Sequence, residues 1–297
     1  MLNTLIPSVI LLGLVFVPLG IAIAAMLWQR RWEQRSDRRS PISERLLHQA
    51  GAQARQKMDA LGDDMMERLA QLMLIGPLAM LVILLPRVRW DRLQLGWLNW
   101  LVIAGATAWV AWLVRSFTQL RRRRRQWREG MLAEIAAAQE LDRLQAEGCF
   151  VLHDVPAGDF NIDHVVVAPH AVFAIETKSR RKPGKGKASA NVGYDGTCLQ
   201  FPGWKETRPI EQARAIADWL AKYLRDKTGE PVVVHPVVCL PGWFVSLVKG
   251  SAGAAVRVIN PKMKSLFLDA GAAPLLTPAQ RNRIVHALSE RYPELTE

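Results

Sequence analysis

The sequence predicts an α/β domain with a mixed central sheet flanked by helices, preceded by an α-helical membrane region. Two observations lead to this prediction. Between residues 131 and 292, the patterns follow the order helix, strand cluster, helix, strand, strand and helix, which is typical of a sheet covered by helices. Before residue 115, long apolar runs without charge alternate with arginine-rich segments, as in membrane proteins.

The N-terminal region is expected to contain three transmembrane helices, at residues 1–28, 69–86 and 95–114. The first and third hold uncharged runs long enough to cross a hydrocarbon core of about 30 Å. Gly76 and Pro77 interrupt the second, so a two-span arrangement with a re-entrant pair is an alternative. The unbroken arginine run Arg121–Arg125 places the C-terminal domain in the cytoplasm by the positive-inside rule.

This topology predicts a multi-pass protein of the cell inner membrane. Residues 29–68 would be a cytoplasmic helical linker and residues 115–130 a basic juxtamembrane segment. The net charge of +12 favours a polyanionic partner, either nucleic acid or the anionic headgroups of the lipid bilayer. The three cysteines are widely spaced and form no C-x-x-C pair, which argues against a structural zinc site or a disulfide framework.

The stretch NIDHVVVAPHAVFAIETK is the centre of the predicted domain. Its two β-branched runs, Val165–Val167 and Val172–Ile175, are separated by a proline-containing turn and predict a hairpin of two buried strands. Asp163 opens the first strand, whereas Glu176 and Lys178 close the second on one face. Two carboxylates and a lysine at a strand end suit a divalent metal and an oriented water. The alternative is the ordinary polar edge of a sheet.

Two helices and a loop flank this hairpin. A helix is expected over Leu132–Ala146, with Glu134 in its first turn, where a carboxylate can simply stabilise the helix end. A second helix should begin near Pro209, with Gln212 early in it. A basic loop after the hairpin, either solvated or able to follow a phosphate backbone, contains Arg180, Arg181, Lys182, Lys185 and Lys187.

Taken together, residues 131–260 resemble the nuclease-related domain (NERD) family, which is placed in the PD-(D/E)XK nuclease-like superfamily. The resemblance lies in the order of the Glu134 helix, EGCFVLHDV, NIDHVVVAP, VFAIETK, PIEQARAIADWL and PVVVHPVVCL. It implies a restriction-endonuclease-like fold. Beyond the resemblance, residues 261–297 are expected to form a C-terminal helical extension of the domain. Family members often have a glycine after the proline of the turn, where this chain has His170 and Ala171.

The resemblance also implies a catalytic set. Asp163 and Glu176 match the two acidic positions, Lys178 matches the lysine, Glu134 the helical glutamate and Gln212 the glutamine of the later helix. The implied cofactor is Mg²⁺, or Mn²⁺. Asp163, Glu176 and the Thr177 carbonyl would be ordinary oxygen ligands for it. Lys178 would orient water or offset charge in the transition state.

In that set, Glu134 would complete the ligand shell or bind a second metal, and Gln212 would position the site. His164 alternates to the opposite face of its strand from Asp163 and is taken as structural.

The expected function is that of a membrane-anchored, metal-dependent nuclease that hydrolyses DNA or RNA at the cytoplasmic face. No small-molecule cofactor is expected. One alternative is a non-catalytic nucleic-acid-binding or interaction module tethered to the membrane. Another is a membrane scaffold whose basic regions bind anionic lipid. The nuclease is favoured because a module that only binds has no need of two carboxylates that repel phosphate.

Overall fold

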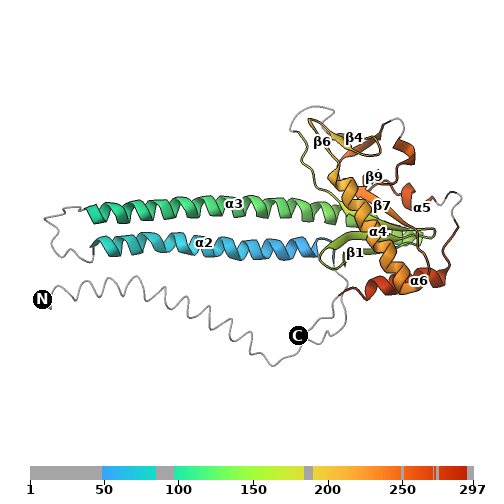
Figure 1. The fold of residues 1–297 in the computed structure, drawn as a ribbon, viewed down its shortest axis with the longest axis horizontal. Coiled ribbons are helices and arrows are strands. Elements are labelled where there is room, and N and C mark those ends of the chain that lie inside the picture. The colour runs from blue at the N-terminus through green and yellow to red at the C-terminus, as the bar shows by residue number, and fades with distance from the viewer. Residues whose placement is uncertain are drawn as a thin grey trace, which may run out of the picture. The chain divides into compact units, whose positions relative to one another are not determined.

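A computed structural model describes residues 49–84, 97–183, 190–248, 251–269, 271 and 274–292 (Figure 1). The first predicted span, residues 1–28, and the beginning of the predicted linker lie outside the described residues. The described chain divides into two compact units. One lies within Asp59–Arg124, and the other combines the residues up to Met58 with those from Arg125 onward.

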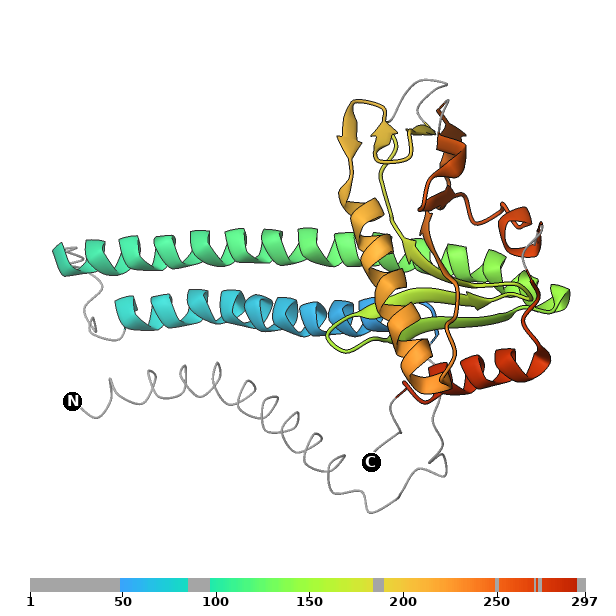
Figure 2. The ribbon, with the colours of Figure 1, turned by 45° about the vertical axis from the view of Figure 1, so that its right-hand side comes forward.

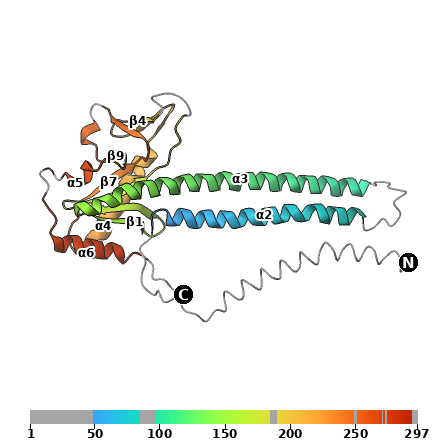
Figure 3. The same cartoon turned by 180° about the vertical axis from the view of Figure 1, so that it is seen from behind.

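Two long helices, α2 (Ala52–Leu84) and α3 (Trp97–Leu141), run beside one another in every view (Figures 1, 2 and 3). Within the first unit, the Arg68 guanidinium lies 5.0 Å from the centre of the Trp112 ring. Among the described residues, no helix combines the length and apolar character that crossing a membrane requires. The structure therefore does not support the predicted spans at residues 69–86 and 95–114. The start of the former and the end of the latter lie inside α2 and α3, which continue past them through charged segments.

The second unit is built on a five-stranded mixed sheet, which confirms the predicted mixed sheet flanked by helices. The first three strands pair antiparallel, and the last two are added in parallel to the third. In spatial order the strands are β1 (Phe150–Pro156), β2 (Asn161–Val167), β3 (Val172–Thr177), β7 (Val234–Cys239) and β9 (Arg257–Ile259).

The central hairpin is buried on both faces, because its side chains alternate between two apolar clusters. Val165 and Ala174 face the helices α4 (Arg208–Thr228) and α6 (Pro278–Ser289). Val166 and Phe173 face the end of α3. Figure 1 shows α4 crossing one face of the sheet, and Figure 3 shows the end of α3 on the other.

The helix expected over Leu132–Ala146 is the end of a longer element. Apolar residues on the last turns of α3 pack on the sheet, and a 3₁₀ turn, η1 (Asp142–Glu147), continues the helix to Gly148. Gly148 adopts φ 82°, a left-handed conformation that glycine adopts without strain, and ends the helix.

A second, four-stranded sheet follows β3 and was only partly predicted. The sequence predicts a strand cluster before the second helix but gives no signal for the two short strands that lie at the edges of this sheet. Their order is β6 (Trp204–Glu206), β5 (Leu199–Phe201), β4 (Asn191–Tyr194) and β8 (Phe244–Leu247). Two short helical turns, η2 (Ser251–Gly253) and α5 (Ser265–Leu268), complete the domain.

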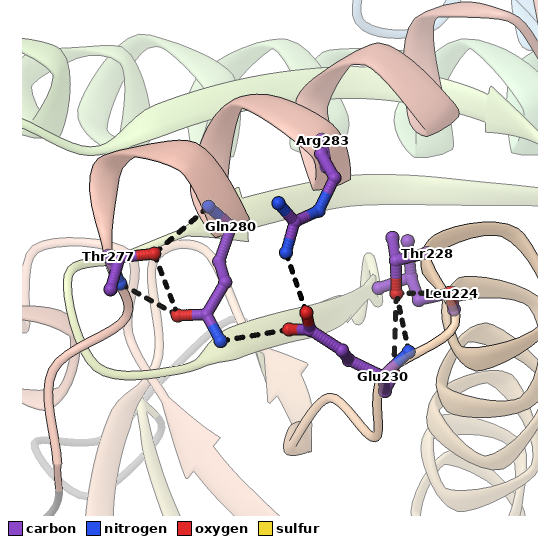
Figure 4. A network of polar contacts seen from close by, with 6 residues as sticks. All are labelled: Leu224, Thr228, Glu230, Thr277, Gln280 and Arg283. Carbon is purple, nitrogen blue, oxygen red and sulfur yellow. Dashed lines mark hydrogen bonds and ion pairs between the residues drawn. The ribbon is translucent and has the colours of Figure 1, made fainter.

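A polar network joins the end of α4 to the start of α6 (Figure 4). Thr277 caps α6 by accepting a hydrogen bond from the Gln280 N–H at 3.2 Å, while the Gln280 side chain accepts one from the Thr277 N–H at 2.8 Å. The Glu230 carboxylate accepts from Gln280 Nε2 at 2.9 Å and from Arg283 Nη2 at 2.8 Å. These contacts hold the two helices that cover the same face of the main sheet.

Candidate active site

Asp163 and Glu176 meet at the end of the central hairpin, as predicted. The last register pair of β2 and β3 is His164 with Ile175, so the two carboxylates follow it on neighbouring strands. The Thr177 N–H donates a hydrogen bond of 2.6 Å to Asp163 Oδ2. The backbone of β3 therefore fixes the orientation of the Asp163 carboxylate.

Lys178 completes the cluster and forms an ion pair with Glu176 through Nζ and Oε1. Glu176 is only 4 % exposed, whereas Lys178 keeps more of its side chain in contact with solvent. The Lys178 N–H donates to the Cys239 carbonyl at 2.9 Å, so β7 holds the backbone where β3 ends. The predicted acidic pair and lysine are thus brought together by three adjacent strands.

Glu134 reaches this cluster from the last turns of α3. Burial, followed by the charges of Asp154 and Glu176, raises the pKa of Glu134 to about 7. The nearby Lys178 and Lys57 oppose this rise. A helix that packs on the opposite face from α4 therefore adds a third carboxylate to the electrostatics of the site.

The cluster carries more negative charge than its cations offset. Burial, followed by the charges of Glu176 and Glu134, raises the pKa of Asp163 well above its ordinary value. Burial also raises the pKa of Glu176, against the opposing effects of Lys178 and Arg180. Carboxylates with raised pKa values at the ends of neighbouring strands are typical of sites that hold cations or protons.

Asp154 is a fourth acidic residue of this region and is absent from the catalytic set predicted from the sequence. It is buried on β1, lies between the register pairs His153–His164 and Val155–Ile162, and adopts φ 48°, which is uncommon for a residue other than glycine. Its carboxylate accepts hydrogen bonds from Asn161 Nδ2 at 2.7 Å and from the Gln53 N–H at 3.1 Å. A lone aspartate inside the apolar segment FVLHDV was the available signal.

Two predicted site residues have less defined roles in the structure. Gln212 is half-buried in the first turns of α4, and among the described residues no hydrogen bond or ion pair joins it to the carboxylates. Thr177 ends β3 and contributes its N–H to Asp163, while its buried Oγ1 has no hydrogen-bond partner among the described residues. The positioning role of Gln212 and the ligand role of the Thr177 carbonyl stay predictions.

The arginines predicted to bind nucleic acid form ion pairs within the chain. Arg180 makes a two-pronged contact with Glu206, through Nε to Oε2 at 2.8 Å and Nη2 to Oε1 at 2.5 Å. Arg181 pairs with Glu129 of α3 in the same way, with Nε to Oε2 at 2.8 Å. Lys182 is exposed, and Lys185 and Lys187 lie outside the described residues. A phosphate would have to compete with the two glutamates for these arginines.

His164 has the structural environment that its position on the strand suggests. It is completely buried on the α3 face, and its Nδ1 lies 2.8 Å from His153 Nδ1. His153 Nε2 in turn lies 3.0 Å from Asp142 Oδ1. Burial lowers the pKa of His164 well below its ordinary value, so the imidazole is neutral and turned away from Asp163.

The donor set fits a hard divalent cation better than a soft one. Among the residues that the structure describes, no group of three or more histidine, cysteine or acidic side chains has a geometry that could hold a metal. Mg²⁺ needs only one or two carboxylates, because it keeps several waters and shares substrate phosphates. The mutual repulsion of Asp163 and Glu176 would be relieved by such a cation, so these two residues fit Mg²⁺ or Mn²⁺.

Comparison with known proteins identifies the domain. A search of curated proteins found no match, and neither did a search of solved structures. Residues 129–241 match the family model of the nuclease-related domain. This segment contains the end of α3, the central hairpin, α4 and β7, and therefore every residue of the cluster described above. Residues 129–241 of this chain are a nuclease-related domain (NERD).

Proposed function

We propose that this nuclease-related domain hydrolyses phosphodiester bonds of DNA or RNA with the help of Mg²⁺ or Mn²⁺. The observation that carries the proposal is the cluster of Asp163, Glu176 and Lys178 at the ends of β2 and β3. Glu134 interacts electrostatically with this cluster. Carboxylates held where their charge is disfavoured, next to a lysine, have no evident use in packing. They are suited to phosphoryl chemistry.

In this proposal, Asp163 and Glu176 would hold the cation, with the Thr177 carbonyl as a further oxygen ligand. The bound cation supplies Lewis-acid polarisation of the phosphoryl oxygen and a lower pKa for its water. The Thr177 N–H keeps one Asp163 oxygen occupied and leaves the other oriented. The pairing of β3 with β7 at Glu176 and Thr177 supports the proposal, because it holds the backbone of both residues in the sheet.

Lys178 and Glu134 have complementary roles in this scheme. The Lys178 ammonium, released from Glu176, donates hydrogen bonds to the attacking water or to a phosphoryl oxygen. Glu134, whose carboxylate interacts electrostatically with Glu176, would complete the ligand shell or bind a second cation. Each role uses a group that the fold already places beside the acidic pair.

We expect the full-length chain to cleave plasmid, linear and single-stranded substrates in the presence of Mg²⁺ or Mn²⁺, and to lose this activity completely in EDTA. Restoring the cation to the same sample should restore cleavage, because the carboxylates remain in place without it. Product sizes on gels give the readout. If cleavage persists unchanged in EDTA, the cation-dependent mechanism is wrong.

A non-catalytic nucleic-acid-binding module is the second candidate. The observation that favours it is the lack, among the described residues, of a third side-chain ligand for the metal. The ion pair between Lys178 and Glu176 also favours it, because Lys178 competes with a cation for the Glu176 carboxylate. The same assay separates the two functions. If the chain binds nucleic acid without cleaving it, and EDTA does not change this binding, the binding module is supported and the nuclease function is wrong.

We also propose that the chain is held at the inner membrane with this domain on the cytoplasmic side. Support comes from the uncharged run at residues 5–28 and from the exposed tryptophans of α3, Trp97, Trp100, Trp109 and Trp112, a residue type that gathers at membrane interfaces. The chain should therefore sediment with membranes and stay there after alkaline carbonate washing. Release into the carbonate supernatant would contradict this location.

A further inference from the structure

The second sheet carries an aromatic cluster beside the acidic site. The Phe201 and Trp204 rings stack across β5 and β6 with centroids 4.8 Å apart and an interplanar angle of 10°. Trp243 meets both rings edge-on, at 5.0 Å from Phe201 and 6.4 Å from Trp204. Because two aromatic neighbours fix the Trp204 ring, its orientation is set in advance of any ligand.

The exposure of the three rings differs sharply. Trp243 is 1 % exposed and Phe201 6 %, whereas Trp204 is 37 % exposed at the edge strand β6. Gly203 precedes it in a tight turn with φ 94°, and a Cβ placed there would have no neighbour within 4 Å. Trp204 is therefore the one ring of the three that reaches solvent, whereas Phe201 and Trp243 belong to the core.

The cluster is tied to the acidic site through short connections. Trp243 Nε1–H donates to the Arg180 carbonyl at 3.1 Å, and Arg180 follows Lys178 by two residues. The Arg180 guanidinium in turn holds Glu206, which shares β6 with Trp204. Val238, the register partner of Glu176, packs in the same hydrophobic cluster as Phe201 and Trp243. The aromatic cluster and the acidic site therefore depend on the same backbone segments, the end of β3 and β7.

The segment that follows Trp204 is basic and suits a phosphate-bearing ligand, because Lys205 and Arg208 are both exposed in it. Lys182 Nζ lies against Gly242, next to Trp243, and Arg208 is exposed at the start of α4. The one carboxylate on β6, Glu206, is offset by Arg180. Proteins that bind single-stranded nucleic acids combine exposed aromatic rings, on which a base stacks, with basic residues that pair with its phosphates.

We propose that Trp204 is a stacking platform for an unpaired nucleobase, so that single-stranded DNA or RNA is the preferred substrate class of the neighbouring acidic site. A base inside a duplex keeps both faces stacked on its neighbours and cannot offer one to the ring. The inference takes its partner from the proposed function but requires no cleavage. It concerns binding alone.

The test measures binding of the full-length chain in EDTA to labelled oligothymidylate, oligouridylate and a hairpin duplex. We expect Trp204→Ala to weaken binding of the single strands about tenfold and of the duplex less than about twofold. Trp204→Phe keeps an aromatic face and should recover most of the affinity. The oligothymidylate and oligouridylate arms tell whether the bound strand is DNA, RNA or either.

Phe244→Ala is the matched control, because Phe244 is an aromatic residue 66 % exposed on β8, at the opposite edge of the same sheet. It should bind like the wild type. Equal binding by Trp204→Ala and the wild type would overturn the platform while leaving the nuclease proposal intact. Equal losses in both alanine variants, or no single-strand binding by the wild type, would overturn it as well. Far-ultraviolet circular dichroism of each variant shows whether it has folded. If Trp204→Ala does not fold, the single-strand affinity of Trp204→Phe decides the outcome.

Discussion

Asp163→Asn should lower the rate of cation-dependent cleavage by about a thousandfold, equivalent to about 4 kcal/mol of transition-state stabilisation. The amide keeps an oxygen that accepts the Thr177 N–H, so the β2–β3 junction is preserved. It loses the negative charge that would hold a divalent cation. The loss should appear in single-turnover cleavage of a linear substrate at saturating Mg²⁺.

The stability of the same variant distinguishes a functional defect from a folding defect. Replacing a buried carboxylate by a neutral amide removes its repulsion with Glu176 and Glu134, so the free energy of unfolding in EDTA should be unchanged or higher. Asp159→Asn, four residues earlier and exposed, is the control and should cleave like the wild type. Cleavage by Asp163→Asn within a few-fold of the wild-type rate would remove this residue from the site.

Glu134→Gln should stabilise the protein above neutral pH when no divalent cation is present. The pKa of Glu134 rises to about 7 in the folded state, from an ordinary value of 4.5. Between these values the unfolded chain has lost this proton and the folded chain retains it, so the free energy of unfolding falls as pH rises through this window. The full shift corresponds to about 3 kcal/mol, and water at the exposed side of the residue reduces this to about 2 kcal/mol.

The measurement is urea unfolding in EDTA at about pH 4 and about pH 8. Wild type and Glu134→Gln should unfold at similar urea concentrations at the lower pH, whereas the variant should be the more stable at the higher pH. Glu140→Gln is the control on the same helix, because Glu140 pairs with Arg143 at 3.2 Å and is not part of the acidic cluster. If the stability of the two glutamine variants depends on pH in the same way, the acidic cluster does not raise the pKa of Glu134.

Much of the domain could be predicted because its signals are local. The two apolar runs predicted β2 and β3, and Pro209 with the apolar stripe that follows predicted α4, since each pattern spans one element. The short strands β6 and β8 carry no such pattern. They have three and four residues, and pairing with β5 and β4 rather than propensity makes them strands.

The boundaries of the long helices were harder to predict than their existence. Changes in composition near residues 69, 114 and 131 were interpreted as ends of elements. The backbone of α2 and α3 continues through all three, because arginine, glutamine and alanine support a helix as well as leucine does. A change in composition along a helix indicates a change in its environment. It does not show where the backbone hydrogen bonds of the helix end.

The sequence by itself determined the acidic pair and its lysine, because Asp163, Glu176 and Lys178 lie on two strands joined by one short turn. Only the tertiary structure decided what surrounds them. The Gln53 N–H meets Asp154 across 101 residues of chain, and Arg181 meets Glu129 across 52. Contacts between residues so far apart depend on how whole elements pack, and no local pattern records that. For the same reason, the partners of the basic loop and the setting of Trp204 emerged only once the chain was folded.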